Sequence, residues 1–132
     1  MIKQETRNSL SLLLLRLGLG AVFILFGYDK LPHPENWIIY YSPKIHQLFP
    51  VSPYIFLKFQ AVVEVLLGVA LAMGFLTRIN ASIIAVILGM IIFFLWPDPV
   101  TVRDLGLFCA SLALVLSGPG PWSLDAFLEA AR

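Results

Sequence analysis

Two residues of opposite charge lie inside hydrophobic stretches that are long enough to cross a membrane. Arg16 interrupts the run LSLLLLRLGLGAVFILFGY, and Glu64 lies within FLKFQAVVEVLLGVALAMGFL. A charge at the centre of a bilayer raises the free energy of insertion by about 2.5–3.5 kcal/mol on insertion scales. Such a residue therefore needs a charged partner, a water-filled cavity or a functional role. We predict that Arg16 and Glu64 pair inside a helical bundle. The pair could be a structural salt bridge that fixes register, or it could hold a headgroup or relay protons.

Helical spacing places small and polar residues beside each of these charges. The residues that share a face are Arg16, Gly20, Phe23 and Gly27 in the first stretch, and Gln60, Glu64 and Gly68 in the second. Gly18 and Gly20 would let a neighbouring helix approach closely. The spacing therefore predicts that these two helices pack together around their charged side chains.

A second group of charges is expected at the other end of the bundle. Asp29 and Lys30 leave the first stretch, and Arg103 and Asp104 enter the last one. Interfacial anchoring is the alternative for these residues, above all for Lys30. The spacing Thr101-x-x-Asp104 resembles a capping box, which predicts Asp104 in the first turn of its helix. The residues that we expect to bind a ligand are Arg16, Tyr28, Lys30, Gln60, Glu64, Arg103 and Asp104.

Four apolar segments predict an all-α integral membrane four-helix bundle in a single domain, residues 1–132. The expected spans are residues 10–28, 54–76, 79–96 and 100–117. Between the first two, residues 32–53 are rich in proline and aromatic residues, and we predict that they form an interfacial cap over one mouth of the bundle. After the run Gly118-Pro119-Gly120-Pro121, we expect Ser123 to cap a short amphipathic helix. Lys3 and Arg7 before the first span and Arg78 in a tight turn favour cytoplasmic termini.

Composition narrows the class of protein. The chain has 132 residues, 59% of them hydrophobic and 13% charged, which is typical of a membrane protein that contacts the lipid bilayer. A net charge of +1 without a basic cluster argues against a nucleic acid partner. The sequence contains no catalytic constellation, metal-ligand motif or phosphate loop, so we predict no catalytic residue, no metal site and no cofactor of its own.

Three segments resemble the DoxX family of small four-helix bacterial membrane proteins. They are RLGLGAVFILFGYDKL, EVLLGVALAMGFLTRINA and RDLGLF followed by SGPGPWSLD. The resemblance implies a multi-pass protein of the bacterial cytoplasmic (inner) membrane that is associated with redox systems. Relatives include a subunit of a thiosulfate:quinone oxidoreductase and proteins linked to oxidative-stress complexes. The redox cysteines and the extra domain of some relatives are missing here, so whether this chain is itself an enzyme stays open.

The leading hypothesis is a membrane subunit of a redox complex that binds a quinone or a similar small amphipathic molecule. In this hypothesis Arg16 and Glu64 orient polar groups, and redox equivalents come from a partner protein. The alternative is a noncatalytic scaffold that assembles partner subunits, and a third hypothesis is a pathway for protons or small solutes. The ligand, the partner and the oligomeric state, including a homo-oligomer, stay open.

Overall fold

The structure is a computed structural model that describes residue 1 and residues 3–132, and the regular elements of these residues are all helices. In chain order they are α1 (Gln4–Lys30), the 3₁₀ helix η1 (Pro34–Tyr40), α2 (Pro43–Leu48), α3 (Pro53–Met73), α4 (Thr77–Leu95), α5 (Pro99–Ser117) and α6 (Leu124–Ala130). Among the described residues, α1, α3, α4 and α5 are long and apolar enough to cross a membrane. The predicted all-α membrane bundle is therefore confirmed.

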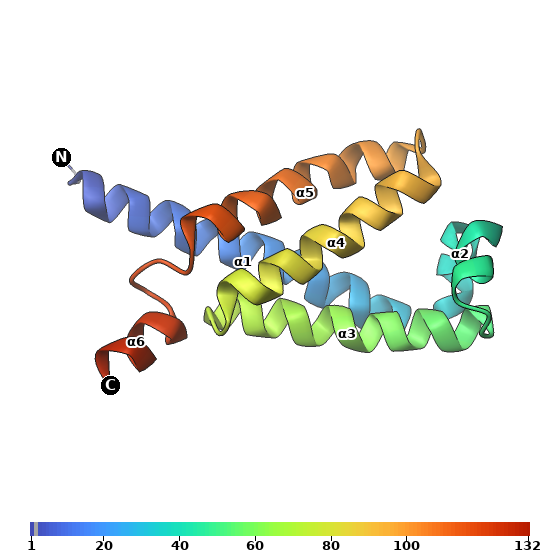
Figure 1. Cartoon of the computed structure of the whole chain (residues 1–132), viewed down its shortest axis with the longest axis horizontal. Helices are drawn as coiled ribbons and strands as arrows, with labels where there is room; N and C mark the ends of the chain where they lie inside the picture. Colours follow the sequence, from blue (N-terminus) through green and yellow to red (C-terminus); the bar gives the residue numbers. More distant parts are fainter. Residues whose placement is uncertain (2) are drawn as a thin grey trace.

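The long helices form two antiparallel pairs. α1 packs mainly on α3, and α4 packs mainly on α5, while smaller contacts join α1 to α5 and α3 to α4 (Figure 1). Both chain ends lie at the end of the bundle where α3 turns into α4, and the cap of residues 32–53 lies at the other end. The core where the two pairs meet includes Phe23, Leu71, Ile84 and Leu114, each at most 4% exposed.

Glycines bring α1 and α3 into close contact. A Cβ atom on Gly20 would lie 2.7 Å from the carbonyl oxygen of Gly68, and one on Gly27 would lie 2.6 Å from the carbonyl oxygen of Ala61. Each position therefore tolerates only glycine without a shift of the helices. The predicted close approach at Gly20 is confirmed, but the prediction for Gly18 is wrong, because a Cβ there would meet nothing within 4 Å.

The predicted capping box at the start of α5 is wrong. Asp98 is the N-cap, and its Oδ1 accepts a hydrogen bond from the backbone N–H of Val100 at 2.9 Å. Thr101 lies inside the helix, and its hydroxyl donates to the carbonyl oxygen of Asp98 at 2.7 Å. The helix starts earlier than we expected because Pro99 suits the first helical position and the Asp98 carboxylate accepts the otherwise unpaired backbone N–H of Val100. Asp104 consequently lies in the second turn.

At the other end of the chain, the predicted cap of the last helix is confirmed. The hydroxyl of Ser123 accepts a hydrogen bond from the backbone N–H of Ala126 at 3.1 Å, at the start of α6. Phe127 and Leu128 on this helix are exposed. α6 thus presents apolar side chains outward, as an amphipathic helix at a membrane surface would.

Candidate functional site

The predicted ion pair between Arg16 and Glu64 does not form, because Glu64 pairs with Lys30. The ammonium group of Lys30 donates to both carboxylate oxygens of Glu64 at 2.8 Å, and the side-chain amide of Gln60 donates to Oε1 at 3.1 Å. The Lys30 and Glu64 side chains are only 5% and 7% exposed. Glu64 is a buried charge that has been paired as expected, but its partner is Lys30 at the C-terminal end of α1 instead of Arg16 in the middle of that helix.

The register of α1 on α3 explains this exchange of partners. Gly20 faces Gly68 and Gly27 faces Ala61, so position 24 of α1 lies opposite Glu64. Arg16 is then about 12 Å away along the axis and Lys30 about 9 Å, at a rise of about 1.5 Å per residue. Because each Cα–Cβ bond tilts toward the N-terminus of its helix, Lys30 and Glu64 on antiparallel helices lean toward each other. The same tilt carries Arg16 away from Glu64.

Arg16 instead lies under the C-terminal segment at the α3–α4 turn. Its side chain is buried, one Nη2–H donates to the carbonyl oxygen of Trp122, and its Nη1 lies against Gly74. Its Nε and Nη1 have no hydrogen-bond partner among the described residues. Asp125 holds the same turn, since its carboxylate accepts the backbone N–H groups of Leu76 and Thr77 at 2.7 and 2.9 Å. Arg16 thus fastens the chain end to the bundle and lies apart from the Lys30–Glu64 pair.

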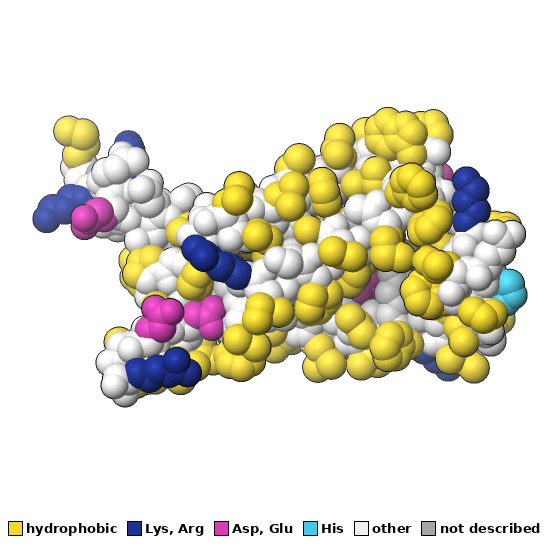
Figure 2. Space-filling model, in the orientation of Figure 1, with side chains coloured by type: hydrophobic (Ala, Val, Ile, Leu, Met, Phe, Trp, Pro, Cys, Tyr) yellow, Lys and Arg dark blue, Asp and Glu magenta, His cyan; other side chains and the backbone are white. Residues whose placement is uncertain are grey.

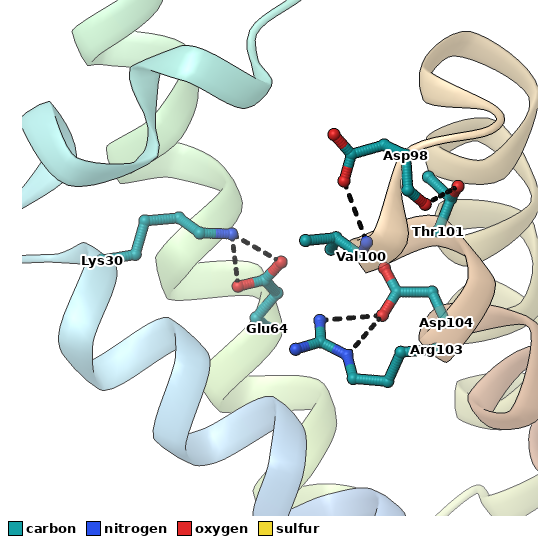
Figure 3. A network of polar contacts seen from close by, with 7 residues as sticks. All are labelled: Lys30, Glu64, Asp98, Val100, Thr101, Arg103 and Asp104. Atoms are coloured by element: carbon teal, nitrogen blue, oxygen red, sulfur yellow. Dashed lines mark hydrogen bonds and ion pairs between the residues drawn. The ribbon is translucent and has the colours of Figure 1, made fainter.

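A second ion pair faces Lys30 and Glu64 from α5. The guanidinium group of Arg103 donates to the Oδ1 of its neighbour Asp104 at 2.9 and 3.2 Å. Asp104 is buried, with a side chain 7% exposed, whereas that of Arg103 is 52% exposed. Figure 3 shows the two pairs on opposite sides of one space, Lys30 and Glu64 from α1 and α3 and the other two from α5. The site therefore contains two cations and two carboxylates around the same space.

This space is a cavity of about 590 Å³ between the two helix pairs and the cap. Its polar lining comes from Lys30, Gln60, Glu64, Arg103 and Asp104, and most of the rest is aliphatic or aromatic. The cap contributes aromatic side chains to the wall, including Trp37, Tyr40, Tyr41 and Phe49. In Figure 2 an acidic side chain is visible at the bottom of a hollow with a hydrophobic rim. An apolar cavity with a few convergent polar groups is typical of a small-molecule site.

Five of the seven predicted ligand-binding residues line this cavity, and two do not. Lys30, Gln60, Glu64, Arg103 and Asp104 are brought together in its wall. Arg16 lies in the middle of α1, and its side chain contacts Trp122 and Gly74 beside the α3–α4 turn. Tyr28 is 73% exposed and is absent from the lining, since it points away from the buried face of α1 that carries Gly27 and Lys30. Helical spacing alone separates Tyr28 from that buried face.

Sequence reasoning did not single out Trp37, although it lines the cavity. Its Nε1–H donates to Asp29 Oδ2 at 2.9 Å, and its ring centroid lies 4.9 Å from the Lys30 ammonium nitrogen. This distance is that of a cation–π contact. The signal that could have found it is the predicted fold-back of the cap, which brings its aromatic residues over the end of α1.

A metal centre finds no support in the described part of the chain. Residue 1 and residues 3–132 contain no group of three His, Cys, Asp or Glu side chains that could hold a metal ion. The cavity, by contrast, could hold an amphipathic organic molecule, since it joins apolar walls to hydrogen-bonding groups.

Comparison with known proteins places most of the chain in a protein family. A family model described as DoxX matches residues 11–96, from α1 to the end of α4. No curated protein and no solved structure matches the chain. The matched part includes Lys30, Gln60, Glu64 and the whole cap, whereas Arg103 and Asp104 lie beyond it.

Proposed function

The chain belongs to the DoxX family of multi-pass membrane proteins, and we propose that it is a subunit of a redox-associated membrane complex that binds a quinone or a similar small amphipathic molecule. The observation that carries this proposal is the buried Lys30–Glu64 pair in the wall of an apolar cavity. The cavity volume of about 590 Å³ lies within the range of ligand pockets, roughly 300–1,000 Å³.

The hydrogen-bonding groups of the cavity fit the headgroup of a quinone. An ammonium group has three donors, and Lys30 uses two of them on Glu64. Gln60 likewise keeps a second amide N–H beside the one that it gives to Glu64. These remaining donors suit the carbonyl oxygens of a quinone, and the carboxylate of Glu64 suits the hydroxyl of a quinol. The aliphatic and aromatic walls suit the ring and its apolar tail.

The charge balance of the site favours a neutral headgroup. Lys30 is paired with Glu64 and Arg103 with Asp104, so the site offers neither an unpaired cation nor an unpaired anion. A charged headgroup would either break one of these pairs or add an unpaired charge to the site, and an unpaired buried charge costs about 3–5 kcal/mol. We therefore expect neutral amphiphiles to bind more tightly than fatty acids or cationic lipids.

The remaining parts of the proposal concern cellular context. We propose the bacterial cytoplasmic membrane, with both termini cytoplasmic and the cap outside, on the basis of Lys3, Arg7 and Arg78. Electrons would reach a bound quinone from a partner protein. A scaffold function is the competing hypothesis, and it predicts that the cavity holds no such ligand.

Solvent extraction of the purified protein followed by mass analysis tests the proposal directly. We expect quinone to copurify with the protein and to be lost on extensive delipidation. A short-tailed benzoquinone should then quench Trp37 saturably in a Trp96→Phe/Trp122→Phe background, since the other two tryptophans do not line the cavity. Gln60→Leu should weaken binding by roughly three- to tenfold, the value of one hydrogen bond. Tyr28→Phe, outside the cavity, is the matched control. Absence of extracted quinone together with non-saturable quenching would refute the proposal.

A further inference from the structure

A second, smaller hollow shares a wall with the cavity. It has a volume of about 210 Å³ and is lined by Asp29, Asn36, Trp37, Tyr40, Val100 and Arg103. We call it the vestibule. Trp37, Tyr40, Val100 and Arg103 line both spaces, whereas Asp29 and Asn36 line the vestibule alone and are exposed. The two spaces are therefore separated by one layer of side chains.

Trp37 is the centre of this shared wall. Its Nε1–H donates to Asp29, which is exposed, while the same ring lies over the ammonium group of Lys30, which is buried. The ring is held in place by Phe26 and Tyr40, at centroid distances of 5.5 and 5.9 Å. A single indole thus stands between an exposed carboxylate and the buried ion pair.

Arg103 completes the wall from the side of α5. About half of its side chain is exposed, yet its guanidinium group donates a hydrogen bond to the buried Asp104. The guanidinium carbon also lies 5.0 Å from the ring centroid of Phe26, a residue of the cavity lining. A long charged side chain of this kind can keep one end wet while its stem and contacts are buried.

We propose that the vestibule is the route by which water and protons reach the Lys30–Glu64 pair, with Trp37 and Arg103 as the partition. A buried pair in an apolar cavity can exchange protons only where water has access, and the vestibule is polar on its outer side. The proposal deepens the proposed function, because a headgroup at Glu64 would exchange its protons by this path. It needs no bound ligand, so it can be tested separately.

The test measures access from water to a thiol placed in the cavity. In a Cys109→Ser background, Val63→Cys puts a reporter thiol in the cavity lining. The protein is reconstituted in liposomes and treated with a cationic, membrane-impermeant methanethiosulfonate. We expect Trp37→Ala, which opens the partition, to raise the reaction rate about tenfold. Asn36→Trp, which fills the vestibule, should lower the rate about tenfold. Trp96→Ala is the matched control, since Trp96 lines neither space.

The outcomes separate clearly. Opposite changes in Trp37→Ala and Asn36→Trp, with Trp96→Ala unchanged, support the route, whether or not any quinone is found. Equal rates in all three variants overturn it. A thiol that a lipid-soluble maleimide modifies, but that the cationic reagent never reaches even in Trp37→Ala, overturns it as well. If Trp37→Ala fails to fold, the decrease in Asn36→Trp decides alone, and an unchanged rate there counts against the proposal.

Discussion

Replacing Glu64 by leucine should lower the free energy of unfolding by about 3–5 kcal/mol, because Lys30 is left as a buried, unpaired charge. Both carboxylate oxygens lie 2.8 Å from the ammonium nitrogen, and the Lys30 side chain is 5% exposed. The amide of Gln60 loses its acceptor in the same variant. No other carboxylate is bonded to Lys30 in the described residues, so the loss should lie near the upper part of this range.

The double variant Lys30→Met/Glu64→Leu should restore most of that stability. Replacing both partners of a buried pair by apolar side chains of similar volume is often neutral, or stabilising by about 1–4 kcal/mol. The same variant should lose ligand binding, since it removes the polar groups that the proposed headgroup needs. Stability and binding should therefore separate in the double variant and fall together in Glu64→Leu.

The assay is unfolding by a denaturing detergent in mixed micelles. Unfolding is monitored by far-ultraviolet circular dichroism and by the change in fluorescence quenching of Trp37. Tyr28→Phe serves as the control on the same helix, because Tyr28 is exposed and lines no part of the cavity. A loss in Glu64→Leu below about 1 kcal/mol, which is typical of exposed ion pairs, would refute the argument that the pair is buried. A double variant as unstable as Glu64→Leu would refute the argument from charge.

Three further predictions concern the contacts that hold the bundle together. Gly68→Ala should destabilise the protein by about 1–3 kcal/mol in the same unfolding assay, since the new Cβ would lie 2.7 Å from the carbonyl oxygen of Gly20. Gly106→Ala is the control and should leave the stability unchanged, because its Cβ would meet nothing within 4 Å. Asp125→Ala should release the C-terminal segment and speed its cleavage by a protease added on that side, whereas Glu129→Ala, an exposed change on α6, should leave the rate unchanged. Asp98→Ala should cost about 1 kcal/mol through loss of the α5 cap, and Asp98→Asn should cost less; equal losses in the two would contradict the capping argument.

The four spans could be predicted from the sequence because length and hydropathy decide them almost alone. Some helices extend beyond the predicted spans. For example, α1 begins at Gln4 rather than Leu10, since polar residues can continue a helix beyond the apolar segment. The predicted stripe Arg16–Gly20–Phe23–Gly27 is buried, because helical periodicity fixes which residues share a face. In the second stripe Glu64 and Gly68 are buried and Gln60 is half-buried.

The partners of the charges could not be predicted from periodicity, because it places residues around a helix but says nothing of how two helices slide past each other. The Gly20–Gly68 contact sets that slide, and the tilt of the side chains then selects Lys30 over Arg16. Asp125 was equally beyond reach, since its carboxylate bonds to Leu76 and Thr77, far away in the sequence. Contacts of this range depend on the whole fold.

The lengths of the connections explain why the cavity lies at one end of the bundle. Between α3 and α4 the chain turns within Gly74 to Leu76, and Arg16 and Asp125 tie the C-terminal segment to that turn, which keeps the two helix pairs together there. Between α1 and α3 the chain has the whole cap, whose aromatic side chains form one wall of the cavity at the other end of the bundle. Arg16 should therefore affect ligand binding only through the stability of the bundle at the α3–α4 turn. Arg16→Met would be expected to weaken the fold and leave the affinity of the folded fraction unchanged, whereas a direct loss of affinity would place Arg16 in the site after all.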